Sequence, residues 1–165
     1  MALWRLSNGV MDYAGCWVIQ TCMISLMNWN HSCGVFIRKT GMLLLAEDVA
    51  VNAEIMKMVL SMREMQVDHA ENGRIAVEMF EEHEEGYYDA VLMDMRMPEM
   101  DGLEATRRIR AMDRSDAKTI PIIALTANAF DEDVQQSMQA GLNAHLSKPV
   151  EPDVLFETLE GLLGT

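Results

Sequence analysis

Five polar residues of this chain each follow a short apolar run, and together they could handle a phosphoryl group. Glu47 and Asp48 follow the run LLLA, and Asp94 follows VLM. Thr126 follows IIAL, and Lys148 follows AHLS. Carboxylate oxygens suit Mg²⁺ and an ammonium group adds a compact positive charge, so the set could neutralise and position a transferring phosphoryl group. Asp94 is then the candidate nucleophile, which would form an acyl phosphate.

Each of these residues also has an ordinary explanation when it is considered alone. An acidic pair at the start of a helix interacts favourably with the helix dipole. Asp94 suits a turn, Thr126 suits a loop or a cap, and Lys148 suits an exposed position before a proline. All five residues lie just after successive predicted strands, so chance is a poor explanation for the whole set. Clustered carboxylates also repel one another unless a cation is present, which favours a metal site.

The apolar runs alternate with segments of helical spacing, and this alternation predicts an α/β fold. Gly73 is expected to break the chain before the second helix, Asp131 to cap the fourth helix and Gly141 to end it. Strands that alternate with helices form a parallel sheet, whose carboxyl ends gather the functional groups. Strands are expected at residues 42–46, 67–70, 88–93, 120–125 and 144–147, and helices at residues 52–63, 75–84, 103–112, 131–140 and 153–163.

The composition changes sharply near residue 41, which indicates two different kinds of polypeptide. All three cysteines and all three tryptophans lie in the first 41 residues, which carry a net charge of +2. The whole chain carries −13, so the remainder carries −15. Residues 1–41 are predicted to be a poorly ordered or non-native leader, such as an upstream reading artefact. A weak membrane-associating segment is the alternative, since the apolar stretch at 14–27 is too short and interrupted to span a bilayer.

Composition and motifs also exclude several classes of function. A strongly acidic chain lacks the basic surface that nucleic-acid binding needs. The cysteines contain no C-x-x-C pair, so a zinc site is not expected, and the absence of cysteine after residue 41 fits a reducing cytoplasm. Neither G-x-G-x-x-G nor a P-loop is present, which argues against a nucleotide-binding module. A haloacid-dehalogenase-type phosphohydrolase needs an acid where this chain has Arg96.

Residues 42–163 resemble the receiver domain of response regulators in two-component phosphorelay systems, the CheY-like domains. The resemblance implies a flavodoxin-like, doubly wound, five-stranded parallel sheet of order 2-1-3-4-5 with five helices. It assigns residues 42–165 to the receiver and implies a cis peptide between Lys148 and Pro149. The segments that carry it are LLLAEDVAVN (43–52), VLMDMRMPEMDG (91–102), IPIIALTANA (120–129) and HLSKP (145–149).

The resemblance also implies a role for each residue of the predicted site. Asp94 is the phosphoacceptor, and Thr126 and Lys148 contact the phosphoryl group. Thr126 and His145 form the switch pair, in which the ring turns inward when the hydroxyl moves toward the phosphate. An exposed strand histidine is the alternative for His145. The implied Mg²⁺ ligands are three carboxylates and one backbone carbonyl, those of Glu47, Asp48, Asp94 and Arg96.

The implied function is phosphorelay signalling by a cytoplasmic phosphoacceptor domain. Its partners would be a histidine kinase or a histidine phosphotransfer domain, with no nucleic acid and no membrane contact by the receiver itself. Such a domain is not an enzyme beyond its own dephosphorylation, and phosphorylation could dimerise it. The sequence resembles the carboxyl-terminal receiver of a bacterial hybrid sensor histidine kinase. A separated or truncated receiver of that kind is therefore expected. A free-standing single-domain regulator is the alternative.

Overall fold

The computed structural model of the chain describes residues 27–29, 36–38, 41–127 and 140–164. The chain divides into two compact units, Met1–Thr40 and Gly41–Thr165. In the first unit, strand β1 (Met27–Trp29) pairs antiparallel with strand β2 (Phe36–Arg38), a pairing that no alternation in this segment predicts. Apart from Gly41, the rest of the predicted leader lies outside the described residues.

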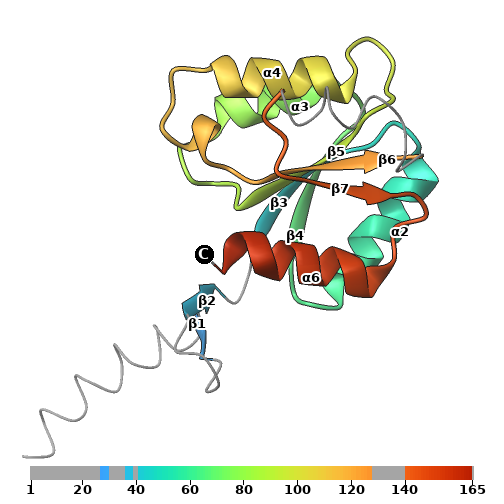
Figure 1. The fold of residues 1–165 in the computed structure, drawn as a ribbon, viewed down its shortest axis with the longest axis vertical. Helices are drawn as coiled ribbons and strands as arrows, with labels where there is room; N and C mark the ends of the chain where they lie inside the picture. Colours follow the sequence, from blue (N-terminus) through green and yellow to red (C-terminus); the bar gives the residue numbers. More distant parts are fainter. Residues whose placement is uncertain (1–26, 30–35, 39–40, 128–139, 165) are drawn as a thin grey trace, which may run out of the picture. The chain divides into compact units, whose positions relative to one another are not determined.

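The second unit is built on a parallel sheet of five strands. The strands run in the spatial order β4-β3-β5-β6-β7, which is the predicted order 2-1-3-4-5 (Figure 1). All neighbouring pairs in this sheet are parallel, so the chain crosses back between successive strands. The carboxyl ends of all five strands therefore lie at the same end of the sheet. The strands are β3 (Met42–Ala46), β4 (Gln66–Ala70), β5 (Ala90–Asp94), β6 (Ile122–Thr126) and β7 (Ala144–Ser147).

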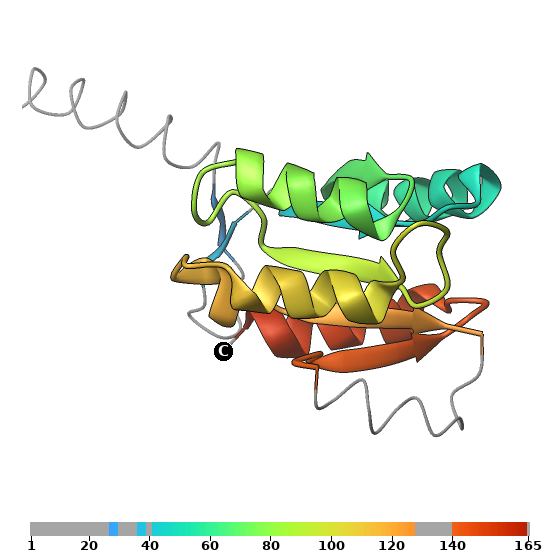
Figure 2. The ribbon, with the colours of Figure 1, turned by 90° about the horizontal axis from the view of Figure 1, so that it is seen from above.

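Helices cover both faces of this sheet. Helices α3 (Gly73–Glu82) and α4 (Gly102–Ala111) lie on one face, and α2 (Ala50–Ser61) and α6 (Pro152–Leu163) lie on the other (Figures 1 and 2). A short 3₁₀ helix, η1 (Asp116–Lys118), follows α4 and was not predicted. The helix predicted at residues 131–140 lies almost wholly outside the described part of the chain. None of the described helices has the length and apolarity that crossing a bilayer requires.

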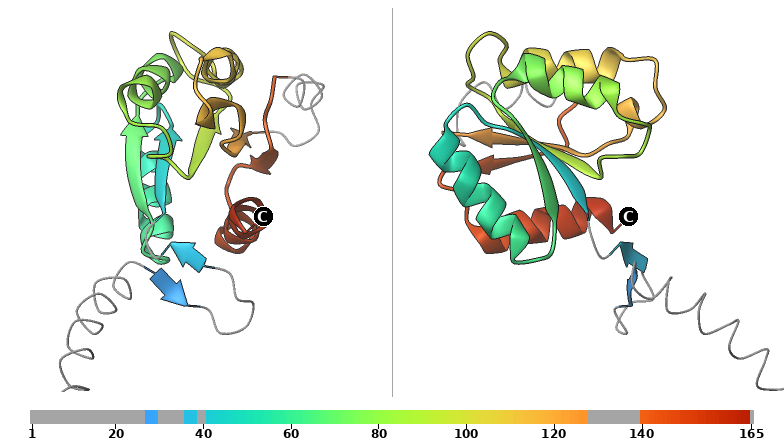
Figure 3. Two further views of the ribbon diagram at one scale, coloured as in Figure 1. Left: turned by 90° about the vertical axis from the view of Figure 1, so that its left-hand side faces the viewer. Right: turned by 180° about the vertical axis from the view of Figure 1, so that it is seen from behind.

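Two apolar layers form the core, one on each side of the sheet. Figure 3 shows the sheet with helices on both of its faces. Successive residues of β3 and β5 point into opposite layers, and both layers are closed by helices. This double burial explains why these strands are apolar at successive positions, up to Asp94 at the end of β5, rather than at alternate ones. One layer contains Leu44, Phe80, Val91, Met93 and Ile109, and the other contains Leu43, Leu45, Leu60, Leu92 and Leu155.

Helix α3 begins earlier than expected, and Gly73 is its first residue rather than a break before it. The Asn72 side chain caps the helix by accepting a hydrogen bond from the backbone N of Ile75 at 2.9 Å. A Cβ on residue 73 would lie 2.6 Å from the carbonyl oxygen of Met100, so glycine is required by close packing. The local pattern alone does not reveal that contact, because Met100 is distant in sequence.

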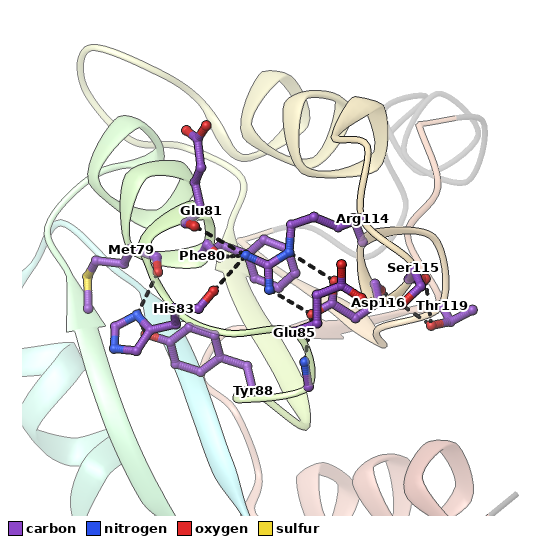
Figure 4. Close-up of polar contacts among 12 residues, drawn as sticks. Met79, Phe80, Glu81, His83, Glu85, Tyr88, Arg114, Ser115, Asp116 and Thr119 are labelled. Carbon is purple, nitrogen blue, oxygen red and sulfur yellow. Dashed lines mark hydrogen bonds and ion pairs between the residues drawn. The ribbon is translucent and has the colours of Figure 1, made fainter.

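The C-terminal end of α3 is held by a guanidinium from outside the helix (Figure 4). Arg114 Nη1 donates hydrogen bonds to the carbonyls of Phe80 at 2.6 Å and His83 at 2.8 Å. Its guanidinium also lies over the Phe80 ring and pairs with Asp116 at 2.9 Å. A cation at this position satisfies orphan carbonyls and complements the helix dipole, so it ties α3 to the segment that follows α4.

The turn into α4 brings its first residue against the end of β5. Asp101 caps the helix, since its Oδ1 accepts from the backbone N of Glu104 at 2.8 Å. A Cβ on residue 102 would collide with the backbone carbonyl of Asp94, so only glycine fits there. The Asp101–Gly102 turn therefore fixes the end of β5, where Asp94 lies.

Replacing Gly102 by alanine is expected to destabilise the protein by about 1–3 kcal/mol, because the new methyl group forces the backbone at Asp94 to move. Urea unfolding of the full chain, followed by far-UV circular dichroism, measures the change. Gly161→Ala is the matched control, since its added Cβ meets nothing within 4 Å and should stabilise α6 by up to about 1 kcal/mol. Equal stabilities of the two variants would contradict this packing.

Candidate functional site

One ammonium group contacts two carboxylates at the end of the sheet where the carboxyl ends of the strands lie. Lys148 Nζ lies 2.5 Å from Glu47 Oε2 and 2.6 Å from Asp94 Oδ2. Glu47 directly follows β3, Asp94 ends β5 and Lys148 directly follows β7. The parallel sheet thus brings together three of the predicted residues that are far apart in sequence.

Both carboxylates of this contact are removed from water. Glu47 is 2% exposed and Asp94 is 6% exposed, whereas the Lys148 side chain keeps 24% of its surface. A buried carboxylate is costly without a partner, so the contact with the ammonium offsets part of the cost of burying both acids. Burial is the largest single influence on the pKa of Lys148 and lowers it. The hydrogen bonds and charges of Asp94 and Glu47 outweigh that influence and raise the pKa above its usual value, so the ammonium stays protonated at physiological pH.

Glu47 is held by further contacts that were not predicted. Its Oε1 accepts a hydrogen bond from Asn52 Nδ2 at 2.9 Å. Its backbone carbonyl lies 2.8 Å from His69 Nε2, and its backbone N donates to the carbonyl of Ala70 at 3.0 Å. An amide side chain on the first helical turn after an acidic strand end is the signal that could have revealed Asn52. The contact of His69 depends on the pairing of β3 with β4 and has no local signal.

Asp94 is also oriented by the loop that follows it. The backbone N of Arg96 donates to Asp94 Oδ1 at 3.1 Å, while Oδ2 faces Lys148. The backbone N of Met95 donates to the carbonyl of Leu125 at 3.0 Å, which attaches the loop to β6. Both oxygens of Asp94 therefore have a defined direction. The role of the Arg96 carbonyl as a metal ligand remains a prediction.

Three carboxylates lie close enough together to hold one metal ion. Glu47, Asp48 and Asp94 each offer a ligand oxygen, and these oxygens lie within 4.8 Å of one another. Asp48 is exposed, so an ion could approach from its side. An oxygen-only set of this kind fits a hard cation such as Mg²⁺. The existing contacts of Glu47 and Asp94 do not prevent ligation, because each carboxylate oxygen accepts more than one partner.

Thr126 and His145 lie on the two strands nearest Lys148. Thr126 ends β6, and its carbonyl accepts a hydrogen bond from the backbone N of Lys148 at 2.7 Å. His145 lies in β7 opposite Ala124, and its Nδ1 is buried without a hydrogen-bond partner among the described residues. The Lys148–Pro149 peptide is cis, as the resemblance implies. The switching roles of Thr126 and His145 remain predictions.

Comparison with known families and proteins gives one consistent result. The family model described as the response regulator receiver domain matches residues 43–160. Hybrid signal transduction histidine kinase I of Dictyostelium discoideum is 33% identical over 138 residues, which cover 80% of this chain and 8% of that protein. Probable histidine kinase 2 of Oryza sativa subsp. indica is 38% identical over 130 residues, which cover 72% of this chain and 12% of that protein. The chain thus spans a small part of these relatives.

Solved receiver structures match the second unit closely. The receiver domain of a sensor histidine kinase from Pseudomonas aeruginosa PAO1, with a magnesium ion coordinated in its active-site cleft, is 38% identical. The match covers 76% of this chain and 99% of that one, with a TM-score of 0.69. The complex of the Saccharomyces cerevisiae histidine phosphotransfer protein Ypd1 with the receiver domain of Ssk1 also matches. It shows 25% identity, a TM-score of 0.64 and coverage of 75% and 89% of the two chains.

Removing the shared ammonium should destabilise the protein. Lys148→Met leaves two buried carboxylates facing each other and is expected to lower the free energy of unfolding by about 3 kcal/mol in the presence of EDTA. Added Mg²⁺ should restore part of this loss by binding the folded state. Urea unfolding of the full chain with EDTA and with Mg²⁺ measures both effects.

Lys57→Met is the matched control, because Lys57 pairs only with the exposed Glu54 on α2 in the described structure. Its loss is expected to stay below about 1 kcal/mol. A Lys148→Met variant as stable as the control would show that the buried contact does not organise this site.

Proposed function

The chain belongs to the response regulator receiver domain family, and we propose that Asp94 accepts a phosphoryl group from a phosphohistidine in a Mg²⁺-dependent reaction. The modified residue then alters a protein-interaction surface. The observation that carries this proposal is the Asp94 carboxylate, 6% exposed, in contact with Lys148 and near two further acids. The geometry supplies a fixed nucleophile, a fixed cation and an oxygen-rich metal site at one edge.

The proposed reaction is a direct phosphoryl transfer. A carboxylate oxygen of Asp94 attacks the phosphorus, the bond from phosphorus to the histidine nitrogen breaks, and the nitrogen leaves with the bonding electrons. Lys148 lies against Asp94 and would contact the phosphoryl oxygens once they arrive. Bound Mg²⁺, held by Glu47, Asp48, Asp94 and the Arg96 carbonyl, would add the positive charge that the incoming group requires.

Thr126 and His145 are the proposed switch. Thr126 ends the strand beside Lys148, and this backbone position supports a role in which its hydroxyl would contact the phosphoryl group. The buried Nδ1 of His145 has no hydrogen-bond partner in the described part of the chain, which supports a ring with an alternative position. A Thr126 shift toward the phosphoryl group would open space for that ring movement.

We further infer that the receiver belongs to a hybrid histidine kinase and receives its phosphoryl group through a histidine kinase or phosphotransfer domain. The similarity to hybrid signal transduction histidine kinase I of Dictyostelium discoideum supports this context. Lack of cysteine after residue 41 supports a reducing compartment such as the cytoplasm.

Helix α2 offers a docking surface for such a partner. Val51, Ile55, Met58 and Met62 are 66%, 57%, 70% and 73% exposed. Their spacing of four, three and four positions places them in one stripe along the helix, while Ala53, Met56 and Leu60 face the core. The stripe begins beside Asn52, which contacts Glu47, so a protein that covers it would reach the acidic site. The matched complex of Ypd1 with a receiver domain supports a histidine phosphotransfer protein as the occupant.

Asp94→Asn should abolish phosphorylation of the full chain by acetyl phosphate and Mg²⁺, because an amide oxygen is a poor nucleophile. Intact-mass spectrometry detects the added phosphoryl group, which hydroxylamine should remove if it is an acyl phosphate. Asp113→Asn, a change at an exposed acid, is the control and should label normally. Labelling of Asp94→Asn at the rate of the unaltered chain would refute the acceptor assignment.

A charge introduced into the α2 stripe should slow phosphoryl transfer from a protein donor and leave transfer from a small-molecule donor unchanged. Ile55→Asp is expected to slow transfer from phosphorylated Ypd1 about tenfold, the effect of losing one buried apolar contact, and to leave acetyl phosphate labelling unchanged. Val154→Asp is the control, since Val154 is 45% exposed on α6. Transfer from Ypd1 that is equally fast in both variants would place the docking surface elsewhere.

A further inference from the structure

Asn52 lies outside the set of residues predicted to perform the chemistry, yet it contacts that set directly. Its Nδ2 donates to Glu47 Oε1 at 2.9 Å, and Glu47 Oε2 lies 2.5 Å from Lys148 Nζ. Lys148 Nζ in turn lies 2.6 Å from Asp94 Oδ2. An unbroken series of three polar contacts therefore runs from the first turn of α2 to the carboxylate that accepts the phosphoryl group in the proposed function.

We propose that Asn52 is a positioning residue for phosphoryl transfer: its amide fixes the Glu47 carboxylate, which in turn fixes Lys148 against Asp94. This inference rests on the proposed function and adds a residue to it. Asn52 does not touch the reacting atoms and acts only through its neighbours.

The geometry of Glu47 explains why such a residue is needed. Its backbone is fixed at the end of β3 by the contacts with Ala70 and His69. Those contacts leave the torsions of a long side chain undetermined, so the direction of the carboxylate depends on what its oxygens meet. Lys148 binds one oxygen and Asn52 binds the other. With both oxygens engaged, the carboxylate has one orientation, and the ammonium that it shares with Asp94 has one position.

The Asn52 contact is distinct from helix capping. Asn52 is the third residue of α2, while the N-cap is Val49, which makes no side-chain capping bond. The amide nitrogen of Asn52 donates to Glu47 Oε1, which lies outside the helix. Helix structure alone would favour an acid at position 52, because a negative charge in the first turn complements the dipole. The site requires the opposite, since an acid there cannot donate to Glu47 and repels it.

The difference between an amide and an acid at position 52 gives a direct test of the proposal. Asn52→Ala and Asn52→Asp are made in the full chain, and the rate of Mg²⁺-dependent phosphorylation by acetyl phosphate is measured beside thermal unfolding. Asn52→Ala should lower the maximal rate about tenfold, the usual effect of removing a supporting contact. Asn52→Asp should lower the rate at least as much, because an acid at this position repels Glu47, and both variants should remain folded at the assay temperature. Glu54→Ala, an exposed change on the same helix, is the control and should label normally.

A double-mutant cycle with Glu47→Ala tests whether Asn52 acts through Glu47. Once Glu47 is absent, Asn52→Ala should cause no further loss of rate, so the two losses should not add. Additive losses, or an Asn52→Asp variant that labels at the original rate, would overturn the positioning role. Asp94→Asn in the same assay separates this failure from failure of the proposed function, because only the latter leaves Asp94→Asn labelled.

Discussion

An ammonium shared between two buried carboxylates is the interaction on which the rest of the site depends. Lys148 touches Glu47 and Asp94, and Asp48 completes a group of acids within 4.8 Å. Two like charges at that separation repel by about 3 kcal/mol at an effective dielectric constant of 20, so the acids gather only with a cation among them. One ammonium against three carboxylates leaves two negative charges, which a divalent ion would balance.

The fold holds these like charges close together because it fixes the backbone positions of the residues that carry them. The parallel strands place Glu47, Asp94 and Lys148 at the same end of the sheet. Helices on both faces bury the strands that lead to these residues. The turn at Gly102 allows α4 to pack against the Asp94 carbonyl. Helix α2 joins the acidic site to the proposed docking surface, since its first turn contacts Glu47 and its outer face carries the exposed apolar stripe.

Residue patterns predicted the five strands and the polar residues at their ends, because apolar runs and their polar ends are local signals. The strand order was predicted only through the resemblance to receiver domains. The residue patterns did not predict the contacts that depend on tertiary approach. Gly73 was expected to break the chain, since its packing against Met100 cannot be read locally. The contacts made by Arg114 and His69 join segments whose relative positions only the folded sheet defines.

Determining the structure of the full chain with Mg²⁺ and beryllofluoride, a mimic of the phosphoryl group, tests the central claim most directly. We expect beryllium bonded to a carboxylate oxygen of Asp94, with Lys148 Nζ within hydrogen-bonding distance of a fluorine and Mg²⁺ among Glu47, Asp48 and Asp94. Beryllofluoride on another acid, or Lys148 directed away from the bound group, would contradict it.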